Sequence, residues 1–335
     1  MSILVLGDAN ADLSAPLDAF PHEGGDAALR DLTWGSGGAG VNVATALALL
    51  GASARLLARV GVDPAGPLAL AAAVRAGVDL SLVQRDPVRS TGLCFAAVSP
   101  GGERTFFSHR GANVALQLPE RDRVLEGIDH VHVCGHALLE GAQRGAAIKL
   151  IDEAWQREIP VSLDLCLPLC RSEADLVLAL APKIALLTGN EAEIALLAPI
   201  SMDHEDDATP LERAITALER REVPRLVVKQ GARGATFVEH RTRTRVPAFA
   251  IDAVDTTAAG DAHVAAVLGA LGNGASLDTA VVRGNAVGAI TTTRLGAAEA
   301  LPTNAELHAF LDADRAARAL APSSSPPPSP PPEIR

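Results

Sequence analysis

Short apolar segments alternate along the chain with longer segments whose hydrophobic residues recur at helical spacing. The short segments have the length and the aliphatic character of buried strands. They are residues 3–6, 54–60, 130–134, 161–165, 184–187 and 226–229. The longer segments, rich in Ala, Leu and Glu, are residues 40–50, 67–76, 142–158 and 211–221. This alternation predicts βαβ units and therefore an α/β fold, with a mainly parallel sheet and helices on both of its faces.

Two stretches depart from the alternation. Residues 91–99 and 104–110 are strand-like and are joined by Pro and Gly at 100–102, which predicts a β-hairpin. A hairpin inserted in an α/β chain often forms a separate flap. A second hairpin is expected from residues 234–239 and 244–249.

The end of the chain changes character. Residues 260–318 are nearly all helical in pattern, whereas residues 322–332 are a run of Ser and Pro. A Pro-rich run cannot form a packed core. We therefore expect one α/β domain over residues 1–318 and a disordered tail over residues 319–335.

Composition narrows the class of protein. The 335 residues are 48% hydrophobic, which excludes disorder of the whole chain. The formal net charge of -11 makes the chain a poor nucleic-acid binder by default. Aromatic residues make up only 3%, with no Tyr, so few rings are available to stack on a nucleobase.

The terminus and the cysteines favour a cytoplasmic protein. The first residues contain no basic segment and become acidic at Asp8, so they do not resemble a signal peptide. No apolar run of about 18 residues predicts a membrane span. Cys94, Cys134, Cys166 and Cys170 form no CxxC pair, and we interpret them as small buried thiols, with a zinc site as the minor alternative.

Gly35, Gly37 and Gly40 form a GxGxxG pattern ahead of a helical segment. In dinucleotide-binding folds this pattern follows a strongly apolar strand, whereas residues 26–33 are mixed in polarity. Two other interpretations are a tight turn that lets a helix pack closely and a substrate pocket lined by backbone. In such a pocket Asn42 would donate and accept hydrogen bonds.

A second segment of small residues, 255–261, precedes an apolar helical segment. The free amides and the positive dipole end of such a helix favour an anion. Asp261 stands at this helix start, where a carboxylate either caps the helix or would repel a phosphate, unless it takes a proton from the attacking group. Because Asp255, Thr256 and Thr257 can already cap the turn, we interpret Asp261 as a catalytic base. No P-loop motif is present, so phosphoryl transfer here would be of another type.

Together, the two segments resemble the two signatures of the ribokinase-like (PfkB) carbohydrate kinases. The first signature corresponds to residues 37–42 and the second to residues 255–261, each with the helix that follows. The resemblance extends over about residues 3–308. It implies a three-layer α/β/α ribokinase-like fold with a mainly parallel sheet and a small β lid, formed by parts of residues 10–35 and 88–112.

The resemblance also implies roles for individual residues. The catalytic group is Asp261 with the backbone amides of Ala258, Ala259 and Gly260. The sugar-binding residues are Asn10, Asp12, Gly37, Gly38, Asn42 and Asn113. The ATP-binding residues are Asn190, Lys229, Gly231, Gly234 and Asn285. Glu193 would organise Mg²⁺ through water, and Asp255, with carbonyls around Asp252, Val254, Arg294 and Gly296, would belong to a site for a monovalent cation such as K⁺. Taken alone, Asp12 would be interpreted as an Asx turn and Asn190 as a helix cap.

Three positions depart from the family pattern. Ala258 stands where the family usually has Gly, and the extra methyl narrows the anion hole. His263 stands where Phe is common, and we expect it to pack on its helix. Residues 164–168 lack the Asn and Arg of an element that many relatives carry, which puts recognition of a substrate phosphate or acyl group in doubt.

The resemblance implies an ATP-dependent kinase that phosphorylates a primary hydroxyl of a sugar such as ribose or fructose. A nucleoside kinase is the main alternative, and Trp34, Phe106 and Phe107 are the nearby candidates to stack on its base. An NAD-dependent oxidoreductase would use residues 35–40 but leaves residues 255–261 unexplained. A sugar-binding regulator without catalysis would lack the base. Family members often pair through such lids, so a homodimer is also an expectation.

Overall fold

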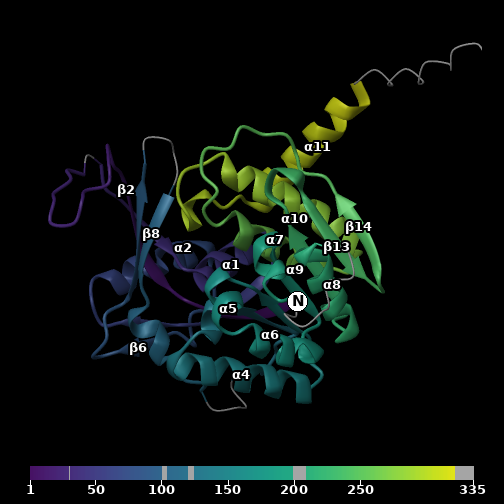
Figure 1. Cartoon of the computed structure of the whole chain (residues 1–335), viewed down its shortest axis with the longest axis horizontal. Coiled ribbons are helices and arrows are strands. Elements are labelled where there is room, and N and C mark those ends of the chain that lie inside the picture. Colours follow the sequence, from purple (N-terminus) through teal and green to yellow (C-terminus); the bar gives the residue numbers. More distant parts are fainter. Residues whose placement is uncertain (30, 100–103, 120–123, 199–208, 321–335) are drawn as a thin grey trace, which may run out of the picture.

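The computed structural model describes residues 1–29, 31–99, 104–119, 124–198 and 209–320 (Figure 1). An eight-stranded sheet runs through it in the order β14-β13-β12-β11-β10-β9-β1-β4. Its strands are β1 (Ser2–Leu6), β4 (Ser53–Leu57), β9 (His130–Cys134), β10 (Val161–Asp164), β11 (Leu186–Asn190), β12 (Arg225–Lys229), β13 (Ala235–Glu239) and β14 (Thr242–Val246). Neighbouring strands are parallel from β4 to β12, and the expected second hairpin, β13–β14, adds two antiparallel strands at the other edge.

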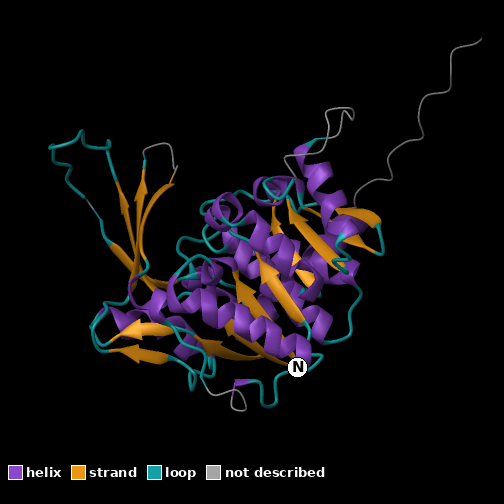
Figure 2. Ribbon diagram, turned by 60° about the horizontal axis from the view of Figure 1, so that its bottom comes forward, coloured by secondary structure: helices purple, strands orange, loops and turns teal. Residues whose placement is uncertain are grey.

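Helices cover both faces of this sheet (Figure 2). Because successive strand residues point to opposite faces, β1 places Ile3 and Val5 in one core and Leu4 and Leu6 in the other. The first core is closed by α1 (Ala39–Leu49), α2 (Ala65–Ala76), α9 (Ala259–Gly272), α10 (Leu277–Thr292) and α11 (Asn304–Leu320). The second is closed by α4 (Gly141–Gln156), α5 (Leu167–Ser172), α6 (Ala174–Leu180), α7 (Glu191–Ala195) and α8 (Pro210–Arg220). The predicted three-layer α/β/α fold is confirmed.

A four-stranded sheet stands beside this body and forms the lid (Figures 1 and 2). Its order is β3-β2-β7-β8, and its strands are β2 (Asn10–Pro16), β3 (Thr33–Gly37), β7 (Gly92–Val98) and β8 (Arg104–His109). The antiparallel pair β7–β8 is the first predicted hairpin. Its turn, residues 100–102, lies outside the described residues. Of the predicted disordered tail, residues 319–335, the first two residues instead continue α11 to Leu320, and the rest lies outside the described residues.

The register of the lid strands assigns their side chains to two faces. One cross-strand row consists of Gly35, Asp12, Cys94 and Ser108. The next row consists of Trp34, Leu13, Phe95 and Phe107, and it points to the opposite face. Arg104 alternates onto the same face as Ser108, and its side chain contacts Asp255 of the body. We therefore call the face with Asp12 the inner face of the lid, and the face with Phe107 the outer face.

The segment 54–60, expected as one strand, is divided between two sheets. The chain leaves the large sheet after β4 and then forms β5 (Arg59–Gly61), which pairs with β6 (Gln84–Asp86). At the junction the carbonyl of Ala58 accepts the amide of Gln84 at 2.9 Å. Arg59 Nε binds Asp86 at 2.9 Å, so β5 is held to its own partner rather than to β1.

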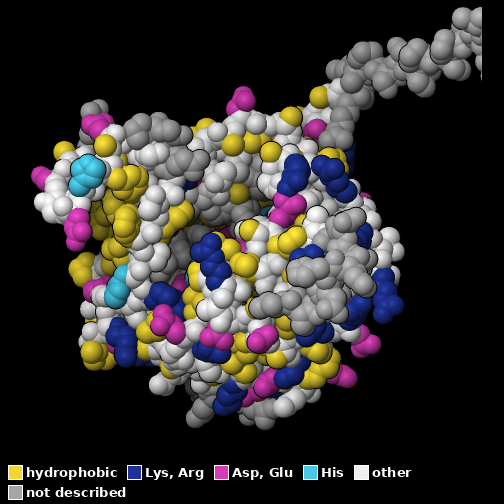
Figure 3. Space-filling view, in the orientation of Figure 1, with side chains coloured by type: hydrophobic (Ala, Val, Ile, Leu, Met, Phe, Trp, Pro, Cys, Tyr) yellow, Lys and Arg dark blue, Asp and Glu magenta, His cyan; other side chains and the backbone are white. Residues whose placement is uncertain are grey.

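Polar residues gather where the parallel strands end. Asp8 follows β1 and His136 follows β9, while Asp164, Asn190 and Lys229 end β10, β11 and β12. The lid begins at this edge, because β2 starts only four residues after Leu6 ends β1. In open α/β sheets ligands bind at the carboxyl ends of the strands. Figure 3 shows the surface hollowed between the lid and the body.

Candidate active site

Helix α9 begins at the predicted anion hole. Its N-cap residue, Ala258, has a φ of 59°, in the left-handed region. The first hydrogen bond into the helix runs from the amide of Ala262 to the carbonyl of Ala258 at 2.9 Å, and the amide of Ala259 donates to Thr256 at 3.3 Å. In the first turn the amides of Gly260 and Asp261 have no acceptor within the helix, so together with the dipole they favour an anion.

Asp261 joins the two glycine-rich segments. Asn42, on α1, donates its Nδ2 to Oδ2 of Asp261 at 2.8 Å. The pKa of Asp261 is raised to about 7, chiefly by burial and then by the charges of Asp164 and Glu193, although Asn42 and Lys229 act in the opposite direction. A carboxylate with this pKa is suited to accept a proton near neutral pH.

Asp12, on the inner face of the lid, and Asn42, on α1 of the body, each carry a buried acceptor. Oδ1 of each is buried without a hydrogen-bond partner in the described structure. A Cβ on Gly37 would lie 2.0 Å from Oδ2 of Asp12, so only glycine leaves room for this carboxylate. The pKa of Asp12 is raised to about 7 by burial, and also by the charges of Glu299 and Asp261. Buried polar atoms without partners are rare, and these two mark a place for ligand hydroxyls.

Asn113 and Gly38 lie against the loop that joins β1 to β2, the strand that carries Asp12. Oδ1 of Asn113 accepts the amide of Ala9 at 2.9 Å, and its Nδ2 donates to Oδ1 of Asn10 at 2.9 Å. Gly38 has a φ of 87°, and a Cβ there would lie 2.5 Å from the carbonyl oxygen of Asp8. The side chain of Asn113 is thus engaged within the protein, where it positions Asn10 and the loop after β1.

The residues predicted to bind ATP surround a cavity of about 410 Å³, with one exception. The cavity is lined by Lys229, Gly231, Gly234 and Asn285, and by Ala259 and Gly260 of the anion hole. His263, expected to pack on its helix, also lines it, and Ala248, Phe249, Ile251 and Ala289 supply apolar walls. Asn190 is the exception, because it is not among the lining residues.

Asn190 and Glu193 form a capping box at the start of α7. Oδ1 of Asn190 accepts the amide of Glu193 at 2.9 Å, and Oε2 of Glu193 accepts the amide of Asn190 at 2.7 Å. The helix-cap interpretation of Asn190 therefore describes its contacts here. Burial raises the pKa of Glu193. Lys229 at the end of β12 donates to Asp164 at 2.7 Å, close to the same edge of the sheet.

Glu193 and Asp164 are suited to a magnesium ion whose other ligands are waters and substrate phosphates. Among the described residues, no group of three or more His, Cys, Asp or Glu side chains is arranged to hold a metal. Mg²⁺ usually keeps several waters and binds through one or two carboxylates together with substrate phosphates. Glu193 and Asp164, whose charges both reach Asp261, supply such carboxylates next to the anion hole.

Sequence reasoning missed the role of Arg104. Its guanidinium pairs with Asp255 and donates to Oγ1 of Thr257, so the inner face of the lid is tied to the loop before α9. Asp255 also accepts the amides of Thr257 and Gly296, both at 2.8 Å. Asp255, expected beside a monovalent cation, is thus paired with an arginine. It also connects the loop before α9 to the loop at Gly296, and the carbonyls of these two loops were assigned to that cation. Whether a cation binds these loops stays a prediction.

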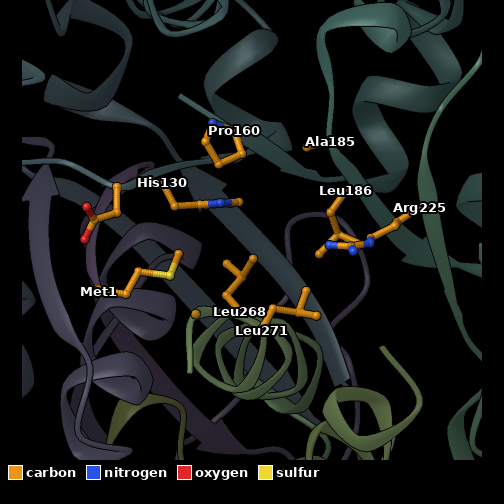
Figure 4. A pocket seen from close by; sticks show the side chains of 10 residues that line it. Met1, His130, Pro160, Ala185, Leu186, Arg225, Leu268 and Leu271 are labelled. Atoms are coloured by element: carbon orange, nitrogen blue, oxygen red, sulfur yellow. The ribbon is translucent and has the colours of Figure 1, made fainter. Parts of the chain in front are cut away.

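A second cavity, of about 490 Å³, opens at the opposite edge of the sheet, among the amino ends of the strands (Figure 4). Leu268 and Leu271 of α9 form its apolar side, and His130 and Arg225 lie at the strand starts. Arg225 is paired with Glu239 at 2.7 Å, and burial lowers the pKa of His130 to about 3. No residue of the predicted site lines this cavity.

The GxGxxG pattern occupies a context that dinucleotide-binding folds do not have. Gly35 and Gly37 lie in β3, an edge strand of the lid, and Gly40 lies in the first turn of α1. The dinucleotide fingerprint instead follows a strand of the main sheet within a βαβ unit. The structure therefore removes the support for the oxidoreductase alternative.

Comparison with known proteins agrees with a carbohydrate kinase. The model of the family described as pfkB family carbohydrate kinase matches residues 1–304. The chain therefore belongs to the PfkB family of carbohydrate kinases.

The similar proteins include kinases that are named for several different sugars. An ATP-dependent ribose-1-phosphate kinase of Halopiger xanaduensis is 32% identical over 92% of this chain and 97% of its own length. Fructokinase-1 of Oryza sativa is 29% identical over 81% of this chain and 86% of its own length. The crystal structure of ribokinase from Thermotoga maritima has a TM-score of 0.80 at 26% identity and covers 93% of this chain and 99% of that one. The structure of Arabidopsis thaliana ribokinase complexed with ribose and ATP shares the fold, with a TM-score of 0.79 at 23% identity over 92% of this chain and 98% of that one.

The conformation of Ala258 predicts an effect on stability. We expect Ala258→Gly to stabilise the protein by about 0.5–1 kcal/mol, because an alanine in the left-handed region carries a penalty of about 1–2 kcal/mol, partly offset by the greater freedom of unfolded glycine. Urea unfolding of both proteins measures the difference. The matched control, Ala259→Gly in the first turn of α9, should instead destabilise. Equal destabilisation by both changes would contradict this account of Ala258.

Proposed function

We propose that this protein transfers the γ-phosphoryl group of ATP to a primary hydroxyl of a sugar such as ribose or fructose. The observation that carries the proposal is the contact between Asn42 and Asp261. It places a half-buried carboxylate of raised pKa at the start of α9 and, at the same time, beside the acceptors of Asn42 and Asp12 that have no partner. Membership of a carbohydrate kinase family supports the same reaction.

In the proposed mechanism the sugar is held by its hydroxyls. These donate to Oδ1 of Asp12 and Oδ1 of Asn42, which direct the primary hydroxyl at Asp261. Asp261 takes the proton while the hydroxyl oxygen bonds to the γ-phosphorus and the bond from that phosphorus to ADP breaks. The amides of Gly260 and Asp261 face the charge that develops on the transferring group. Positioning and electrostatic stabilisation therefore supply the catalysis.

The cavity of about 410 Å³ suits the nucleotide. Its apolar walls would cover the base, and Lys229 and Gly260 lie where phosphates would extend toward the anion hole. When bound, Mg²⁺ neutralises charge on the phosphate oxygens. Glu193 would act on this ion through water. The lid, tied down by Arg104, would exclude water and so suppress ATP hydrolysis.

A nucleoside kinase is the second candidate, and the lid register counts against it. Of the three rings considered for stacking on a base, only Phe106 alternates onto the inner face. Trp34 and Phe107 belong to the outer row. One exposed ring at the lid tip is a poor platform for a nucleobase.

A coupled assay of ADP release tests the proposed function. The assay compares pentoses, hexoses, keto-sugar acids and nucleosides at a fixed ATP concentration. We expect sugars to release ADP faster than nucleosides. Activity confined to nucleosides would favour the second candidate, and absence of ADP release with every acceptor would contradict both. Repeating the assay with K⁺ replaced by Na⁺ tests the monovalent-cation site.

We also propose a homodimer formed through the outer face of the lid. Trp34 and Phe107 are each about half exposed there, at 51% and 54%, in a row with Leu13 and Phe95. Exposed apolar patches of this kind mark interaction surfaces. We expect Phe107→Glu to convert the dimer to a monomer in light-scattering measurements at micromolar concentration. A matched change on the body, Val74→Glu, should leave the dimer intact, and a wild-type monomer would contradict the proposal.

The remaining proposals concern location and partners. We propose a cytoplasmic enzyme that acts on a small molecule without a nucleic-acid partner, which the net charge of -11 supports. In the described part of the chain, no helix combines the length and apolarity needed to span a bilayer. Cell fractionation tests the location: recovery with the membranes would contradict it.

A further inference from the structure

Around the proposed sugar site the positive charges are paired, whereas the negative charges of Asp12 and Asp261 are not. In the described part of the chain the cationic side chains of Lys229, Arg104 and Arg110 lie around the site, and each is held by a carboxylate. Lys229 is paired with Asp164 at 2.7 Å, and Arg104 is paired with Asp255. The third is Arg110, which follows the last strand of the lid.

Arg110 is held by Asp8 in a two-pronged ion pair. Its Nη2 lies 3.0 Å from Oδ1 of Asp8, and its Nε lies 3.2 Å from Oδ2. Gln143 of α4 donates to the same Oδ1 at 2.9 Å and accepts from Arg110. Asp8 is only 4% exposed, so solvent screens this pair weakly. Bidentate pairing of this kind fixes a guanidinium in place and occupies the donors that would recognise another anion.

The backbone connects this pair to the residues of the proposed sugar site. The carbonyl of Asp8 accepts the amide of Gly40 at 3.1 Å, in the glycine-rich segment. The carbonyl of Arg110 accepts Nδ2 of Asn113 at 3.0 Å, and the same amide group holds Asn10. Arg110 thus lies at the loop that carries Asn10 into the lid, where Asp8 and the exposed Glu140, 3.5 Å from its Nη1, offset its charge.

The remaining charges of the pocket are negative. Asp12 and Asp261 have no cation bonded to them among the described residues, and their mutual repulsion contributes to the raised pKa of Asp12. His136, at the same edge, adds little positive charge because burial lowers its pKa. An anionic group on the sugar would thus meet the carboxylates of Asp12 and Asp261, with Glu299, itself paired with Arg75 at 3.4 Å, close to Asp12, and no unpaired cation among the described residues.

We propose that Asp8 is a specificity-determining residue which, by holding Arg110, restricts the substrate to uncharged sugars and excludes sugar phosphates and sugar acids. This inference rests on the proposed function and narrows it. It predicts that the substrate of this chain differs in charge from that of its ribose-1-phosphate kinase relative in Halopiger xanaduensis, whose named substrate carries a phosphate.

Matched pairs of sugars test the inference on the unmodified protein. The pairs are ribose with ribose 1-phosphate, fructose with fructose 6-phosphate, and glucose with gluconate. We expect kcat/KM for the neutral member to exceed that of the anionic member by about 100-fold in every pair that is used, because juxtaposed like charges are strongly unfavourable. A pair in which the anionic member is the better substrate would overturn the inference and leave the proposed function standing.

Asp8→Asn tests the mechanism of selection. The change keeps the size of the side chain but removes the buried carboxylate that holds Arg110, and leaves only the exposed Glu140 at 3.5 Å. The ratio of anionic to neutral kcat/KM should therefore rise about tenfold or more. Asp8→Glu, which keeps the charge, should leave the ratio near that of the unmodified protein. Adding Arg110→Gln to Asp8→Asn should return the ratio to its starting value. A merely structural role for Asp8 would lower both rates together, and an unchanged ratio in Asp8→Asn would overturn the inference.

A binding measurement covers the case in which no sugar is phosphorylated. That result would contradict the proposed function, and the inference would then depend on titration with inorganic phosphate. A saturating non-hydrolysable ATP analogue fills the anion hole during this titration. We expect phosphate to bind at least about tenfold more tightly to Asp8→Asn than to the unmodified protein. Equal affinity would overturn the inference as well.

Discussion

Asp261→Asn is expected to lower kcat by about two to four orders of magnitude, the range that general bases contribute, while ATP binds with nearly unchanged affinity. The amide keeps the size of the side chain and its place in the first turn of α9, but it cannot take the proton of the attacking hydroxyl. Steady-state kinetics gives kcat, and calorimetric titration with ATP gives the dissociation constant. Full turnover in this variant would contradict the role of Asp261.

A matched control separates catalysis from helix capping. Asp278 stands in the first turn of α10 and is exposed, so Asp278→Asn makes the same change to a helix start away from the site. We expect its kcat to be unchanged. The pH profile adds a second readout: kcat/KM of the unmodified protein should fall as pH drops below about 7, because protonation disables the base. This acid limb should become weaker in the residual activity of Asp261→Asn, because only Asp12, whose pKa is also raised to about 7, still titrates there.

Asp12→Ala is expected to lower kcat/KM for the sugar by about 100- to 1,000-fold. Each hydrogen bond to a charged acceptor contributes about 1.5–3 kcal/mol, and the carboxylate of Asp12 would accept from sugar hydroxyls. KM for ATP should change little, because Asp12 lies in the lid and the nucleotide cavity is lined by other residues. Initial rates at varied sugar and varied ATP concentrations separate the two effects.

The control for Asp12 is a carboxylate outside the site. Asp79 pairs with Arg55 at 2.7 Å on the surface, and Asp79→Ala should leave the kinetics for both substrates unchanged. An unchanged sugar KM in Asp12→Ala would place the sugar elsewhere. A parallel rise in the KM for ATP would indicate that the lid itself had been disturbed.

The body of the fold could be predicted because its strands are buried on both faces. Residues 130–134 were predicted as a short strand-like run, and they form β9 with the same bounds. The segment 54–60 shows the limit of this reasoning. Its residues, Ala, Leu and Val with two arginines, carry no Gly or Pro that would mark a break. Only the pairing of β5 with β6 reveals that the chain changes sheet.

Residues of the candidate site could be predicted where they belong to a local sequence motif. Asp261 and Asn42 stand in the two glycine-rich segments, and the structure brings them to 2.8 Å. The partners of Arg104 and Arg110 could not be predicted, because they lie far away in the sequence and no local spacing indicates which charges will meet. Both arginines stand in the lid segment that was expected from the resemblance, yet their ion pairs decide how the lid is held.

The central claim is that the γ-phosphoryl group of ATP moves to a primary hydroxyl of a neutral sugar. Phosphorus–proton correlated NMR of the product tests it directly, because it identifies the carbon that carries the new phosphate. The account predicts a cross-peak between the phosphate and the protons of a CH₂ group, with one ADP formed for each sugar phosphate. A phosphate attached to a secondary carbon, or ADP accompanied only by inorganic phosphate, would contradict it.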